Sequence, residues 1–106
     1  MPPAKAPALK PADARKYLAR VPDDVVFWVH DDGALHDLAE LANSLETMTD
    51  DTYAHHTNAS KNDFVNWVRD VIGDQALVTD LARAANRAAA TAAVQTRLAK
   101  LRSNAA

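Results

Sequence analysis

Apolar residues recur every three to four positions along most of the chain, which is the spacing of one face of an α-helix. The clearest stripe ends at Gly73, a residue suited to the left-handed end of a helix. Its members are Phe64, Trp67, Val68, Val71 and Ile72. A second apolar face, at residues 38–45, follows Asp37, which with Glu40 has the spacing of a capping box. The pattern therefore predicts a mainly α-helical domain.

Further helix starts are predicted where polar side chains can accept backbone hydrogen bonds. Thr49 precedes a short helix that we expect to end near His56. Ser60 with Asp63 has the spacing of a second capping box, and Asp74 is expected to cap the helix that follows Gly73.

A short β-hairpin is expected before these helices. Residues 25–29 are β-branched and aromatic, which is typical of a strand. An Asp-Gly turn signal follows, and residues 34–36 can form the return strand. Because a hairpin of two strands is only marginally stable alone, it must pack on the helices.

The last helix is expected to be long and rich in alanine, over residues 75–102. At about 1.5 Å per residue it would measure roughly 42 Å, whereas a domain of this size has a radius of gyration of about 13 Å. Its far end is therefore expected to extend beyond the core or to pack on another chain. Val94, Leu98 and Leu101 would then anchor that end. The alternative is a frayed helix that rests only on the high helix propensity of alanine.

These patterns predict one small helical domain with a short β-hairpin and a long C-terminal helix. Residues 1–11 contain four prolines and are expected to form a flexible arm. The helical core domain is expected at 12–80, with the hairpin near 25–36, followed by the alanine-rich helix at 75–102 and a disordered tail at 103–106.

The composition excludes several classes of protein. The chain has 106 residues with two glycines and 6% aromatic residues, which argues against a β-sandwich or a barrel. It has no cysteine, so disulfides, zinc–thiolate sites and thiol nucleophiles are excluded. No apolar run is long enough to cross a membrane, and the first residues lack the apolar run of a secretory signal. We therefore expect a cytoplasmic protein with no membrane partner.

The net charge of −2 hides a strong asymmetry along the chain. Residues 1–20 carry +4, residues 21–74 carry −10 and residues 75–106 carry +4. Such a pattern has two interpretations. The basic ends can fold back on the acidic middle, in the same chain or in a neighbour, or they can bind a polyanion such as nucleic acid. The first is favoured, because the acidic middle would repel the same polyanion.

The histidines give no clear sign of a metal site. His55 and His56 are adjacent, and neighbouring side chains on a helix point about 100° apart. His30 and His36 flank the hairpin turn, but no fixed spacing unites them with the other pair. The paired aspartates lie at turns and helix starts, where they have a local structural role. We expect no metal, no cofactor and no catalytic residue.

The densest motif in the chain runs from Lys61 to Asp74 and reads KNDFVNWVRDVIGD. Upstream of it lie Phe27-Trp28-Val29-His30 with Gly33, Leu38, Leu41, Leu45, Met48-Thr49-Asp50, and Tyr53, His55, His56 and Asn58. Over residues 25–80 this pattern resembles a family of small uncharacterised prokaryotic domains, found in archaea and some bacteria. The resemblance implies a module that binds or assembles rather than a self-contained catalyst.

The expected function is a non-enzymatic protein-interaction or self-assembly module in which the long C-terminal helix pairs with its symmetry mate or with a partner helix. The expected interaction surface comprises Asn62, Asn66, Arg69, Arg83, Arg87, Val94, Arg97, Leu98 and Leu101. Two alternatives remain. One is a nucleic-acid-associated protein that binds through its basic ends, and the other is a small-ligand or metal-binding domain that uses the histidines.

Overall fold

The computed structural model describes residues 9–30 and 33–105, and the mainly helical fold predicted from the sequence is confirmed over these residues. The elements are α1 (Pro11–Leu18), the 3-10 turn η1 (Asp23–Val25), β1 (Phe27–Trp28), β2 (Ala34–Leu35), α2 (Leu38–Thr47), α3 (Asp50–His56), α4 (Asp63–Trp67), the π-helical turn η2 (Val68–Ile72), α5 (Gln75–Arg83) and α6 (Arg87–Ala105).

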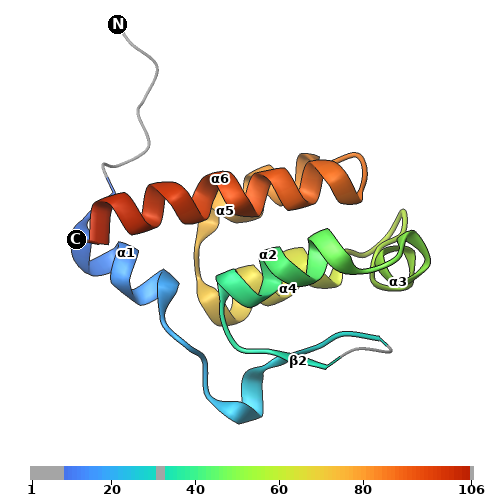
Figure 1. Ribbon diagram of the computed structural model, residues 1–106, viewed down its shortest axis with the longest axis horizontal. Helices are drawn as coiled ribbons and strands as arrows, with labels where there is room; N and C mark the ends of the chain where they lie inside the picture. Colours follow the sequence, from blue (N-terminus) through green and yellow to red (C-terminus); the bar gives the residue numbers. More distant parts are fainter. Residues whose placement is uncertain (1–8, 31–32, 106) are drawn as a thin grey trace, which may run out of the picture.

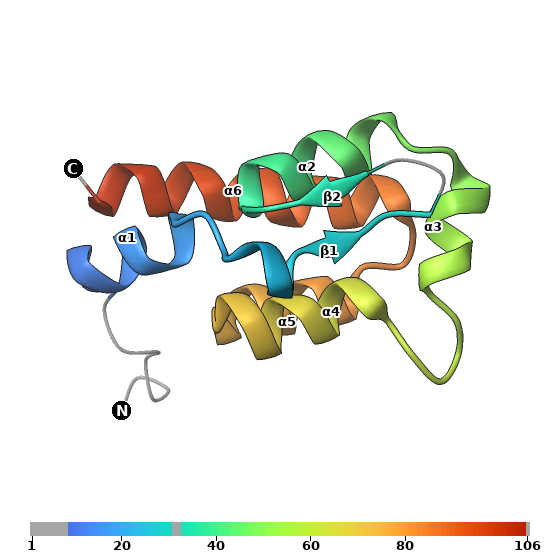
Figure 2. The same ribbon diagram turned by 90° about the horizontal axis from the view of Figure 1, so that it is seen from below.

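The helix α6 runs along one side of the molecule and the hairpin lies on the other (Figure 1). Between them lie α2 and α4, so that the helices form the body and the hairpin covers one face of it. Figure 2 shows β2 beside α2, and β1 on the side of α4 and α5. Packing on the helices thus stabilises a hairpin that would be only marginally stable alone.

The hairpin was predicted correctly, and its two faces differ in environment. β1 and β2 are antiparallel, with Phe27 opposite Leu35 and Trp28 opposite Ala34. Phe27 and Leu35 face the body and are buried, with 7% and 6% of their surface exposed. Because successive residues of a strand point to opposite faces, Trp28 and Ala34 lie on the outer face. One strand residue in two therefore contributes to the core.

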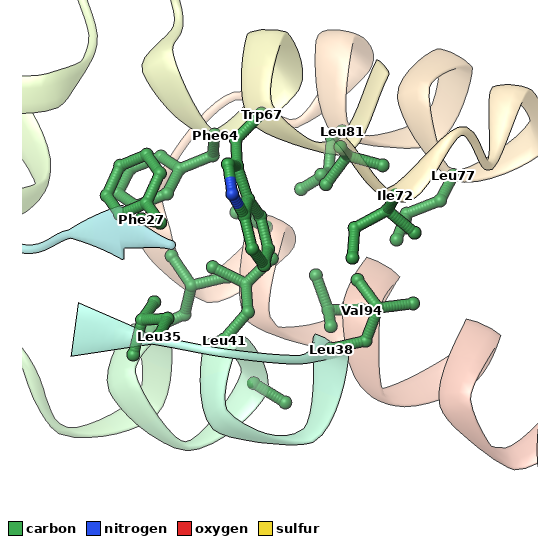
Figure 3. Packing of buried hydrophobic residues seen from close by; sticks show 14 of the residues in the cluster. Phe27, Leu35, Leu38, Leu41, Phe64, Trp67, Ile72, Leu77, Leu81 and Val94 are labelled. Carbon is green, nitrogen blue, oxygen red and sulfur yellow. The ribbon is translucent and has the colours of Figure 1, made fainter. Parts of the chain in front are cut away.

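The core forms where the hairpin meets the helices, and its buried residues include members of α1, α2, α4, α5 and α6 as well as of the strands. Figure 3 shows side chains from β1, β2, α2, α4, α5 and α6 meeting around Trp67. The stripe predicted at residues 64–72 is confirmed, with Val71 only half-buried. The indole N–H of Trp67 donates to the carbonyl oxygen of Val25 at 2.8 Å, which satisfies its polar atom inside the core.

Most of the predicted helix caps are confirmed. Asp37 and Thr49 accept hydrogen bonds from backbone N–H groups three residues ahead, and Gly73 ends η2 with a φ of 85°. Ser60 was the wrong cap for α4. The helix begins at Asp63, and Asn62 caps it by accepting from the N–H of Val65.

The single helix predicted over residues 75–102 is wrong, because the chain forms two helices there. α5 ends at Arg83 and α6 begins at Arg87. The backbone turns to an extended conformation at Ala84, which ends α5. Asn86 then caps the start of α6, since its side-chain oxygen accepts from the N–H of Ala89 at 2.8 Å. Folding back lets Leu77 of α5 and Val94 of α6 enter one core, which a straight rod would not allow.

The expectation that the far end of the last helix extends beyond the core or packs on another chain is also corrected. α6 packs along α1 and α2 of its own chain. Val94, Leu98 and Leu101 are 0%, 5% and 0% exposed, so the chain's own core holds the side chains expected to anchor a partner. The frayed-helix alternative is also wrong, because these residues bury one side of α6.

The two ends of the chain also differ from the expectation. Helix α6 continues to Ala105, so the tail predicted at 103–106 is helical over its described part. The arm predicted at 1–11 lies mostly outside the described residues. Its last residues are ordered, with Leu9 packed against the core and Pro11 at the start of α1.

Candidate interaction surface and neighbouring cavity

Two arginines expected on an interaction surface tie helices together inside the chain. Arg97 of α6 forms a two-pronged ion pair with Asp74, at 2.7 and 2.8 Å, and that carboxylate is 1% exposed. Arg87 binds Asp50 at 2.8 Å and also donates to the carbonyl oxygens of Leu45 and Glu46 at the end of α2. These side chains position α6 on the body and are not presented to a partner.

The remaining polar residues of the predicted surface have different local environments. Asn62 is used as a helix cap, and Asn66 is half-buried. Arg69 is exposed and pairs with its neighbour Asp70 at 3.0 Å, a hydrogen bond that raises the pKa of the Arg69 guanidinium. Arg83 is exposed at the end of α5. A common role for these residues as an interaction surface stays a prediction.

The basic ends fold back on the acidic middle of the same chain, as the charge pattern predicted. Each of three ion pairs joins a basic terminal block to the acidic block. They are Arg20–Glu40 at 3.3 Å, Arg87–Asp50 at 2.8 Å and Arg97–Asp74 at 2.7 Å. The first is largely exposed and contributes little to stability, whereas the last is buried.

The fold also brings the two basic ends of the sequence together. α1 packs against the far half of α6, and Arg15 donates to the carbonyl oxygen of Ala105 at 3.4 Å (Figure 1). We call the exposed cations of these two helices and of the residue before α1 the basic surface. Its members are Lys10, Arg15, Lys16, Lys100 and Arg102. The charges of these residues are evident in the sequence, but the contact of α1 with α6 could not be predicted from it.

At another place on the molecule, Trp28 is 71% exposed. Among residues 9–30 and 33–105, the only other large hydrophobic side chain that is substantially exposed is Val25, at 37%. Trp28 lies opposite Ala34 on the outer face of the hairpin, and we call these two residues the Trp28 face. Asp23 and Asp24, both exposed, precede it in η1. The Trp28 face is therefore an apolar spot beside acidic residues.

Three of the four histidines meet where the hairpin contacts α3. His56 is 6% exposed, its Nε2 accepts from the backbone N–H of His30 at 3.0 Å, and its Nδ1 lies 3.0 Å from Asp63. Nδ1 therefore carries the proton and donates to the carboxylate. The ring of His55 stacks on that of His30, with centroids 3.9 Å apart. The spacing in the sequence gave no signal of this junction.

The arrangement of His56 serves structure. An Asp–His pair can activate a nucleophile only when the second ring nitrogen is available, and here a backbone N–H occupies it. His36 lies elsewhere, held by Glu40 at 2.9 Å. Within the described part of the chain, no group of three or more histidine, aspartate or glutamate side chains is placed to hold a metal ion.

A cavity of about 460 Å³ opens between α3, the loop that follows it and the connection from α5 to α6. It is lined by Tyr53, Thr57, Asn58, Ala59, Ser60, Lys61, Asn62, Val65, Ala82, Ala84 and Ala85. Burial raises the pKa of the Tyr53 hydroxyl, so this group stays protonated at neutral pH. Sequence reasoning placed Asn62 on a surface but did not link it with Tyr53.

Comparison with models of protein families, with curated proteins and with solved structures gave no match. The family resemblance over residues 25–80 therefore stays a prediction. None of the helices in the described ranges combines the length and the apolar character needed to cross a membrane.

Two of the groups with a shifted pKa, His55 and Glu40, predict a loss of stability in acid, in two steps. Desolvation in the stack, followed by the nearby His30, lowers the pKa of His55 below 6.5. The unfolded chain then binds this proton more readily, so stability decreases as the pH falls through about 6.5. The backbone N–H of His36 holds the pKa of Glu40 below 4.5, so a second decrease begins near pH 4.5.

We expect the thermal midpoint, followed by circular dichroism from pH 8 to pH 3, to fall in these two windows. His55→Asn should flatten the upper step and leave the lower one, and Glu40→Gln should do the reverse. An upper step that is unchanged in His55→Asn would contradict the assignment.

Proposed function

We propose that this chain is a non-enzymatic self-assembly module in which the Trp28 face of one copy packs on the basic surface of the next. The observation that carries the proposal is Trp28, whose side chain is 71% exposed on the outer face of the hairpin. Exposure of the large apolar surface of a tryptophan to water is unfavourable. Tryptophans are concentrated at the centres of protein interfaces, where this surface is buried.

Charge complementarity supports a second copy of the chain as the occupant. Asp23 and Asp24 stand beside the Trp28 face, whereas α1 and α6 carry the basic surface. Two Trp28 faces packed on each other would bring acidic residues together, so the contact joins unlike surfaces of the two copies. Arg15 or Arg102 can in addition stack on the indole ring, since guanidinium groups interact favourably with tryptophan.

The long helix has a narrower role than the sequence predicted. Its apolar side is buried by α1 and α2, and it contributes the exposed Lys100 and Arg102 to the contact. The resemblance of residues 25–80 to a family of small prokaryotic domains implies binding or assembly and agrees with the proposal.

Sedimentation velocity of the full chain tests the contact. At about 25 mM salt we expect association that grows with protein concentration and weakens at about 500 mM salt, because opposite charges are then screened. Trp28→Ala should weaken it about thirtyfold or more, since central aromatic residues contribute about 2 kcal/mol or more. Trp28→Phe should retain part of the affinity.

Arg102→Gln and Arg83→Gln form a matched pair of controls, because both arginines are exposed but only Arg102 belongs to the basic surface. Only the first should weaken association. The proposal would be refuted if the chain stayed monomeric in low salt, or if the Trp28→Ala variant associated as strongly as the unchanged chain. If a DNA duplex bound with steep salt dependence and Arg102→Gln reduced that binding, the basic surface would instead serve nucleic acid.

A further inference from the structure

The cavity beside α3 has a rim that is built before any ligand arrives. The side-chain oxygen of Asn58 accepts from the N–H and the hydroxyl of Ser60 and from the N–H of Lys61, at 2.8 to 2.9 Å. The N–H of Asn58 donates back to the carbonyl oxygen of Lys61 at 2.8 Å, and Thr57 pairs with Asn62. A ligand would therefore bind to a loop that is already ordered, so little conformational entropy of the loop would be lost on binding.

Another part of the cavity wall is apolar. Val65 of α4 and three alanines of the α5–α6 region, Ala82, Ala84 and Ala85, line it. Tyr53 completes the wall, and its ring lies parallel to that of Phe64, with an angle of 9° and centroids 5.6 Å apart. The ring is thus fixed by the core, and the cavity offers a flat surface beside small side chains.

Lys61, Asn62 and Tyr53 offer hydrogen-bond donors on the cavity wall, whereas the hydroxyls of Thr57 and Ser60 donate within the chain. Among the described residues that line it, Lys61 alone is charged, and its ammonium uses one contact, to Asp63 at 3.3 Å. Asn62 uses its side-chain oxygen to cap α4, which leaves its NH₂ group as a donor. Among residues 9–30 and 33–105, no group accepts a hydrogen bond from that NH₂ or from the Tyr53 hydroxyl.

A volume of about 460 Å³ lies within the range of small-molecule sites, which combine an apolar wall with a few polar groups. We propose that this cavity binds a small organic anion, whose anionic group contacts Lys61 and Asn62 and whose apolar body packs on Val65, the alanines and the ring of Tyr53. A ligand with a carboxylate and one with a phosphate monoester share this chemistry. The site is separate from both proposed assembly surfaces.

Titration of the ¹⁵N-labelled full chain with benzoate and with phenyl phosphate, followed by amide chemical shifts, tests the site. We expect saturable shifts at residues 57–62 and 82–86 for at least one of them, with the indole signal of Trp28 unchanged. Acetate and inorganic phosphate lack the apolar body, and benzamide lacks the charge, so all three should bind at least about tenfold more weakly.

Lys61 and Arg69 provide matched variants, because both are exposed and pair with a nearby aspartate, but only Lys61 lines the cavity. Lys61→Met should weaken binding of the preferred anion about tenfold, whereas Arg69→Met should leave it unchanged. Tyr53→Phe keeps the ring and tests the hydroxyl separately. The absence of saturable shifts with both aromatic anions, or equal affinities in Lys61→Met and Arg69→Met, would overturn the proposal.

Discussion

Arg97→Met is expected to lower the free energy of unfolding by about 3–5 kcal/mol, because it leaves a buried carboxylate without its partner. Asp74 is 1% exposed and accepts both prongs of the guanidinium, at 2.7 and 2.8 Å. The same carboxylate caps α5 through the N–H of Leu77. The pair thus joins the start of α5 to the middle of α6, and urea denaturation followed by circular dichroism measures its loss.

A double variant separates the cost of the orphaned charge from that of lost packing. Asp74→Asn combined with Arg97→Met removes both charges, so we expect it to cost less than the sum of the single changes. Arg69→Met is the matched surface control, since Arg69 pairs with Asp70 in solvent and should cost at most about 1 kcal/mol. A similarly small cost for Arg97→Met would show that the pair is not buried in solution.

The elements predicted correctly depend on signals that lie within a few residues. The stripe at 64–72 repeats at helical spacing, the strand at 27–28 is aromatic, and Gly73 marks a helix end. The break at Asn86 was missed because alanine on both sides favours a continuous helix. It is fixed by the contacts of α6 with α1, α2 and α5, which residues far apart in the sequence supply.

The candidate sites also depend on contacts between residues far apart in the sequence, and these contacts were not predicted. Asp74 was predicted as a helix cap, and this is confirmed, but its partner Arg97 lies 23 residues away. His56 binds His30 at a separation of 26 residues, so no spacing rule unites them. The position of Trp28 on the outer face follows from the alternation of strand residues, yet its exposure depends on what covers the hairpin. Local sequence patterns specify the helices and strands, whereas the candidate sites depend on the contacts between these elements.

Phe64→Ala is the second change with a large expected effect. Phe64 is 1% exposed and lies at the centre of an aromatic cluster. Its ring centroid is 5.0 Å from that of Phe27, 5.3 Å from His56 and 5.6 Å from Tyr53. Removing the ring leaves a cavity between the hairpin, α3 and α4, which we expect to cost about 3–5 kcal/mol in chemical denaturation.

Trp28→Ala is the informative control for this experiment, because it removes an even larger aromatic side chain from the hairpin on which Phe64 of α4 packs. Since Trp28 is 71% exposed, its loss should change the stability of the monomer by no more than about 0.5 kcal/mol. The two substitutions then divide the aromatic residues by role: Phe64 stabilises the fold, and Trp28 is available for contact. If Trp28→Ala destabilised the monomer as much as Phe64→Ala does, Trp28 would be a structural residue and the proposed assembly contact would lose the observation that carries it.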